Sequence, residues 1–219
     1  MDLSRIALMG HSRGGEAAAT AAAFNRMKYD PEDANIHFDY GFAIKAVVAI
    51  APADGQYKPA QHRWIEDVSY LTLQGAHDAD VSSFMGSRQW EHVRYTQPGP
   101  WFKAEIFAYR ANHGQFNTVW GRSDAGEPLS WLLNLKPLLP GSEQRRFSKT
   151  NIAGFLEVTL HDRLVYVHTL HQSLPGRIVL AGCFVRRGRR PHDNHGDGRT
   201  HRGREPVHLA GRPNSVAGG

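Results

Sequence analysis

Apolar residues are grouped along the chain in short runs that end at turn-forming residues. Runs of this length, rich in branched and aromatic side chains, are typical of buried β-strands. They predict strands near residues 5–9, 45–50, 69–74 and 103–109. The last of them also alternates apolar and polar residues, which is the pattern of a strand in its own right.

Helical patterns follow the first and the last of these strands. The stretch from Glu16 to Met27 is rich in alanine and has little bulk, which predicts a helix lying close against a sheet. Apolar residues on one face predict a final helix over Phe147–Leu160. Val165–Val167 and Arg177–Leu180 are weaker candidate strands, where the pattern loosens. The arrangement predicts an α/β fold with a mostly parallel sheet flanked by helices.

The candidate chemistry begins directly after the first strand, at the pentapeptide Gly10-His11-Ser12-Arg13-Gly14. A GxSxG turn between a strand and a helix holds a serine hydroxyl on a strained, exposed corner. Ser12 is therefore the candidate nucleophile, and the backbone N–H of Arg13 is the candidate oxyanion donor. The alternative interpretation is a Gly-Ser turn that merely opens a helix.

A serine nucleophile needs a base, and the base needs an orienting carboxylate. Asp78 and His113 each follow a predicted strand, in the order Ser, Asp, His. Asp80 lies on the same short loop as Asp78 and is the alternative acid. Asp54, after the strand near 45–50, is a third candidate, although capping of the turn before Gly55 explains it more simply.

These residues resemble the α/β-hydrolase superfamily over roughly residues 3–160. The resemblance rests on the motifs GHSRGG, GAHDAD and NHGQFN, and extends more loosely to the dienelactone hydrolase and polyester hydrolase (cutinase-like) branches. It implies Ser12 as nucleophile, His113 as general base and Asp78 as acid, because the superfamily usually places the acid three residues after the loop glycine, here Gly75. It implies no metal and no organic cofactor.

Two aromatic side chains are expected beside the substrate. Trp120 closely follows the catalytic histidine and is the best candidate for a pocket wall. His11 is expected to diverge from Ser12 on the sharp turn and to pack or form hydrogen bonds near the substrate. Trp64, Trp90 and Trp101 are equally well explained by core packing. His77 and Asp80 lack a third ligand at metal spacing, and no catalytic frame surrounds His37, His62 or His92.

Only Met1 to Arg5 precede the first predicted strand, whereas this superfamily places further strands and a second oxyanion donor upstream. The sequence therefore predicts an incomplete α/β-hydrolase fold that lacks its N-terminal part. Its first strand is then expected to lie at an exposed sheet edge, where it favours association and poor solubility. Activity of the isolated chain is expected to be weak.

The last residues differ in composition. Residues 182–219 hold eight Arg against three acidic residues, a net charge of +5 that equals that of the whole chain. We expect three regions: a hydrolase part at 1–160, an extension at 161–181 and a disordered Arg/Gly-rich tail at 182–219. A shifted reading frame in a GC-rich gene explains such a tail better than nucleic-acid binding, because interleaved aromatics and repeats are missing.

Composition limits the remaining possibilities. The chain has 219 residues, 41% of them hydrophobic, which suits one globular domain. It contains neither an apolar run of membrane-spanning length nor a signal peptide, so no membrane partner is expected, and the compartment stays open. The single Cys183 excludes an internal disulfide. The sequence favours hydrolysis of small or polymeric carboxylic esters; the alternatives are amide hydrolysis or a non-catalytic fragment.

Overall fold

The computed structural model describes residues 2–57, 64–81, 84–125, 132, 134–167 and the backbone of 178–185. The chain divides into two units, Met1–Gly188 and Arg189–Gly219, and the second unit lies wholly outside the described residues. The predicted tail therefore falls outside them from residue 186 onward. No helix in the described ranges has the length and apolar character needed to cross a membrane.

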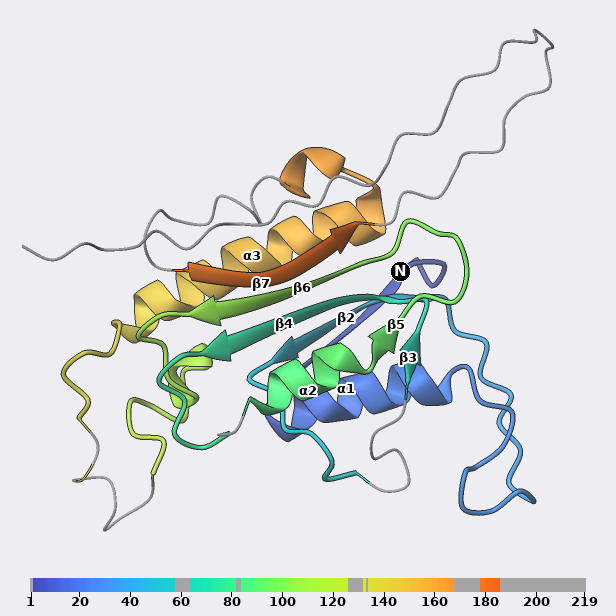
Figure 1. Cartoon of the computed structure of the whole chain (residues 1–219), viewed down its shortest axis with the longest axis horizontal. Helices are drawn as coiled ribbons and strands as arrows, with labels where there is room; N and C mark the ends of the chain where they lie inside the picture. The colour runs from blue at the N-terminus through green and yellow to red at the C-terminus, as the bar shows by residue number, and fades with distance from the viewer. Residues whose placement is uncertain are drawn as a thin grey trace, which may run out of the picture. The chain divides into compact units, whose positions relative to one another are not determined.

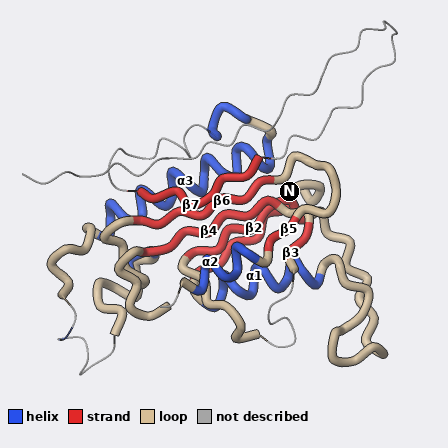
Figure 2. The backbone as a smooth tube through the Cα atoms, viewed as in Figure 1, coloured by secondary structure: helices blue, strands red, loops and turns tan. Residues whose placement is uncertain are grey.

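A five-stranded sheet forms the centre of the described unit (Figures 1 and 2). Its strands lie in the order β1, β2, β4, β6, β7, and all neighbours are parallel except the antiparallel pair β6 and β7. The bounds are Ile6–His11, Ile44–Ile50, Ser69–Gly75, Phe102–Ala108 and Ile178–Val185. The α/β class with a mostly parallel sheet is thus confirmed, and the four predicted strands are its first four.

Helices cover both faces of this sheet (Figure 1). Helix α1 (Arg13–Phe24) packs its small side chains against alternate residues of β2, among them Val47 and Ala49. Helix α3 (Gly141–His161) covers the other face, where Phe155 packs with Val48 and Leu71. Burial on both faces explains why these strands are continuous apolar runs.

Shorter elements complete the unit. Helix α2 (Met85–Glu91) lies on the same side as α1 (Figure 1). A second, two-stranded parallel sheet joins β3 (Ile65–Glu66) to β5 (Val93–Arg94). Strand β1 lies at the edge of the main sheet, and the side chain of Met9 is 61% exposed there.

Three expectations near the end of the chain need correction. Helix α3 starts at Gly141, six residues before the predicted Phe147. Its first turns carry the polar residues Gln144 and Arg145, which bond the loop after β6 and add nothing to an apolar period. The candidate strand Val165–Val167 is wrong: Asp162, in a left-handed conformation, ends α3, and the chain then winds into a 3₁₀ turn over Leu164–Tyr166. Strand β7 extends to Val185, past the predicted tail boundary at 182.

Candidate active site

Ser12 stands alone between β1, which ends at His11, and α1, which begins at Arg13. Its backbone has φ 58° and ψ −126°, a conformation that non-glycine residues rarely adopt. Backbone hydrogen bonds hold it there: its N–H donates to the carbonyl of Ile50 at 2.8 Å, and its carbonyl accepts from the N–H groups of Gly15, Ala53 and Glu16 at 2.9, 3.2 and 3.4 Å. The sequence thus forms a sharp strand-to-helix corner with a serine at its tip.

Glycine at position 10 makes this corner possible. A Cβ on Gly10 would lie 1.9 Å from the carbonyl oxygen of Gly14, an approach that no packed structure tolerates. A Cβ on Gly15 would lie 2.9 Å from the Cβ of Pro52, in the loop after β2. At Gly14, by contrast, a Cβ meets no described atom within 4 Å.

We expect Gly10→Ala to lower the free energy of unfolding by about 4 kcal/mol or more, because backbone must move to relieve the clash. Gly14→Ala is the matched control and should change it by less than about 1 kcal/mol, since alanine favours the helix and fits without contact. Urea unfolding followed by circular dichroism measures both. Equal stability of the two variants would contradict the described corner.

Asp78 and His113 meet although they follow different strands, β4 and β6. The Nδ1 of His113 lies 2.8 Å from Oδ2 of Asp78, and the two side chains are only 2% and 7% exposed. The other carboxylate oxygen of Asp78 accepts the backbone N–H groups of Asp80 and Val81, at 3.0 and 2.8 Å. Asp78 is therefore held rigidly and can orient the imidazole.

Asp80, the alternative acid in the sequence analysis, does not contact the Nδ1 nitrogen of His113 that Asp78 contacts. Its Oδ2 lies 3.3 Å from Nε2 of His113, on the opposite side of the ring from Asp78, and its side chain is 55% exposed. The contact lacks the geometry of a hydrogen bond, and Nε2 has no hydrogen-bond partner among the described residues. Asp80 therefore faces the nitrogen that a general base would use.

The charges around His113 change its proton affinity. Burial by itself lowers the pKa of His113, but the hydrogen bond that its ring N–H donates to Asp78 and the negative charges of Asp78, Asp80 and Asp124 outweigh it and raise the pKa above its ordinary value. His11 behaves oppositely: burial, followed by repulsion from His113, lowers its pKa to about 4. Near neutral pH His11 is therefore uncharged.

Two aromatic rings, those of Trp120 and His11, pack beside the base. Trp120 lies parallel to the His113 ring, with centroids 5.6 Å apart and an interplanar angle of 9°. The His11 ring lies 4.7 Å from His113 and 4.6 Å from Trp120. The amide of Asn117 contacts Nδ1 of His11 at 3.3 Å. His11 thus packs against Trp120 and forms a polar contact with Asn117, and its ring lies beside the base.

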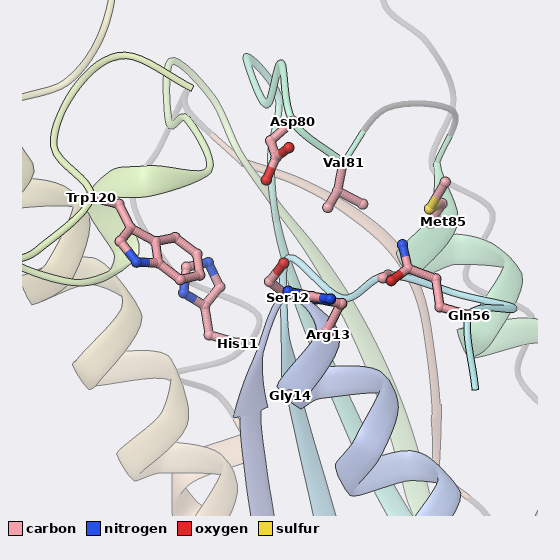
Figure 3. Close-up of a pocket in the computed structure, with 10 residues that line it drawn as sticks. His11, Ser12, Arg13, Gly14, Gln56, Asp80, Val81, Met85 and Trp120 are labelled. Atoms are coloured by element: carbon pink, nitrogen blue, oxygen red, sulfur yellow. The ribbon is translucent and has the colours of Figure 1, made fainter. Parts of the chain in front are cut away.

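A cavity of about 650 Å³ opens at the serine, a size typical of small-molecule sites. In Figure 3 the Ser12 hydroxyl points into it, toward Asp80, while Trp120 and Met85 stand on opposite sides. Gln56, which the motifs did not indicate, also lines it. The buried carboxylate of Glu16 accepts the N–H groups of Gln56 and Tyr57, at 2.6 and 3.0 Å, and thereby fixes this part of the wall.

The loop that carries His113 is held by residues that sequence reasoning missed. Gln144, fully buried in α3, accepts the backbone N–H of Asn112 at 3.2 Å and donates to its carbonyl at 2.7 Å. Asp124 accepts the backbone N–H groups of His113 and Gly114. A polar residue on a helix and an aspartate in a loop are too common to have been recognised from their sequence context.

The other candidates lie elsewhere. Asp54 lines a separate small cavity with Glu16 and Gln89. His77 packs against Tyr109, His37 against Tyr29, and His92 against Trp64. Trp90 packs against the Lys103 ammonium, and Trp101 lines a cavity with Arg5 and Lys45. His62 lies outside the described residues.

Within the described ranges, no three His, Cys, Asp or Glu side chains are grouped so as to hold a metal ion.

A scan against protein-family models found no match to this chain, and a search of curated proteins found none either. The resemblance to α/β-hydrolases therefore stays a prediction from the sequence motifs.

Proposed function

We propose that this protein is a serine hydrolase that cleaves carboxylic esters, and that it belongs to the α/β-hydrolase superfamily. One observation carries the proposal: the buried Asp78–His113 pair contacts residues that line the cavity into which Ser12 projects from a strained, positive-φ corner, namely Asp80, His11 and Trp120. A nucleophile, a base and an orienting acid are thus gathered from three separate loops at one end of the sheet. This is the arrangement that acyl transfer requires.

Each residue has a chemical role in the proposed reaction. The Ser12 hydroxyl attacks the ester carbonyl carbon while Nε2 of His113 takes its proton. Asp78 on Nδ1 keeps the imidazole in the tautomer whose Nε2 is free to accept. Collapse of the tetrahedral intermediate passes that proton to the leaving alcohol, and the acyl group stays on Ser12. Water, activated by the same nitrogen, then releases the carboxylic acid.

The negative oxygen of the intermediate is stabilised at the start of α1. The first N–H groups of a helix have no partner within it, and the helix dipole places partial positive charge there. Arg13 is the first residue of α1 and follows the nucleophile directly. Its backbone N–H is therefore the proposed oxyanion donor.

Asp80 must give way during the reaction, because it occupies the approach to Nε2. Its carboxylate is more than half exposed, so rotation into water has little desolvation cost. Trp120 and Met85 provide apolar walls, and Gln56 provides a polar one. The proposed substrates are small esters, or polymeric esters whose chain lies across the open cavity.

Covalent labelling tests the proposal directly. We expect a fluorophosphonate probe to add to Ser12, because it reacts with serines activated by a base. Trypsin cuts after Arg5 and Arg13, and Ser12 is the only serine in the peptide Ile6–Arg13, so the mass of that peptide identifies the site. Ser12→Ala should abolish the adduct, whereas Ser4→Ala, at an exposed serine, should retain it. Folded protein that stays unlabelled would refute the proposal.

A further inference from the structure

The carboxylate of Asp124 lies between the loop of the acid and the loop of the base. Its Oδ1 accepts hydrogen bonds from Gly114 N at 2.9 Å and from Asn112 Nδ2 at 2.7 Å. Its Oδ2 accepts from His113 N at 2.8 Å and from Ala79 N at 3.1 Å. Three of these donors belong to the loop after β6, and Ala79 belongs to the loop after β4.

The position of these bonds gives Asp124 its importance. Nearer to the strands, Ala76 N donates to Ala108 O and His77 N to Ala111 O, which joins the bases of the two loops. Asp124 joins them farther out, through the residue that follows Asp78 and through His113 itself. Hydrogen bonds to a charged acceptor are about twice as strong as neutral ones. Four such hydrogen bonds to the Asp124 carboxylate restrict the movement of the two loop tips relative to each other.

We infer that Asp124 is a positioning residue whose carboxylate fastens the acid loop to the base loop and so sets the contact between Asp78 and His113. Its catalytic consequence rests on the proposed function, whereas the positioning itself requires no reaction. Asp124 acts through the backbone of its neighbours and is placed outside the cavity that Ser12 lines.

An asparagine at this position cannot replace the carboxylate. Each oxygen of Asp124 receives two N–H donors, so an amide turned either way would point its own NH₂ group at two donors. The loops must then separate. Asp124→Ser is a second variant, in which the smaller side chain leaves room for water to satisfy the N–H groups while the loops are released.

The experiment compares Asp124→Asn and Asp124→Ser with the wild type in the full chain. We expect kcat on p-nitrophenyl acetate to fall about 100-fold with KM within about threefold, because a small misplacement of catalytic groups has that effect. We also expect the downfield proton resonance of Nδ1–H of His113 to move upfield or disappear. Asp33→Asn, in an exposed loop where Asp33 also accepts from Asn35, is the matched control and should change neither quantity.

The resonance separates this inference from the proposed function. Wild-type kcat with an unchanged resonance in both variants would overturn the inference, as would a loss of kcat with the resonance unchanged. A displaced resonance in a protein that hydrolyses no ester would support the positioning and refute the hydrolase. The groups that face His113 and can carry charge are His11, Asp78, Asp80 and Asp124. Because the negative charge of Asp124 helps to raise the pKa of His113, its removal should make His113 titrate at lower pH in both variants.

Discussion

Replacing His113 with asparagine is expected to lower kcat for ester hydrolysis by about 10⁶-fold, because without the base the Ser12 hydroxyl is a poor nucleophile. The substitution removes the proposed acceptor of the serine proton and the partner of a buried carboxylate. Steady-state hydrolysis of p-nitrophenyl acetate measures the loss. Near-ultraviolet circular dichroism checks that the variant is folded.

His37→Asn is the control for this substitution. His37 is an exposed histidine in the segment after α1. Ser12 lies at the opposite end of that helix, so the loss of His37 should leave hydrolysis unchanged. Turnover by folded His113→Asn within tenfold of the wild type would contradict the assignment. His11, the histidine that lines the cavity, would then be the next candidate base.

Asp78→Asn is expected to lower kcat by about 10⁴-fold while leaving the fold intact. The amide can donate a hydrogen to Nδ1, which favours the tautomer whose Nε2 carries the hydrogen and cannot accept the serine proton. The reaction is measured at a pH where the wild type is fully active. A loss of less than tenfold would show that another carboxylate orients His113.

Asp80→Asn is the matched comparison, because the two carboxylates contact opposite nitrogens of the same ring. His113 is an effective base only when deprotonated, so kcat/KM should rise as pH increases through its pKa. The negative charge of Asp80 contributes to raising that pKa. Its removal should therefore move the rise in kcat/KM to lower pH, without the large loss expected for Asp78→Asn. A shift to higher pH would exclude this role.

The central strands and the corner at Ser12 were predictable because their causes are local. Continuous apolar runs such as Ala46–Ile50 mark strands buried on both faces, and Gly10, two residues before the serine, marks a turn that a side chain would block. The meeting of Asp78 and His113 followed from topology, since parallel strands place the residues after them at one edge. The sequence could not separate Asp78 from Asp80, because both lie on one short loop. What distinguishes them is the nitrogen of the His113 ring that each one faces, and this depends on the folded loop.

What escaped prediction depends on contacts between distant residues. Helix α3 begins at Gly141, and within its first turns Gln144 bonds the backbone of Asn112, a contact that no periodic pattern reveals. Asp124 joins two loops through four hydrogen bonds, which appear in the sequence only as one acidic residue among many. Strand β7 continues past Leu180 because it pairs with β6 along its whole length, as far as Phe102 opposite Val185. This pairing depends on the residues of β6, so the sequence of β7 alone does not reveal it.

The parallel stack of Trp120 on His113 also gives the protein an optical signal of its own. Protonated imidazole quenches the emission of an adjacent indole, and neutral imidazole does so far less. The fluorescence of Trp120 should therefore follow the charge of the base as pH changes, without substrate, probe or label. Against the emission of the other four tryptophans, this component reports the protonation state of the proposed base in the resting protein.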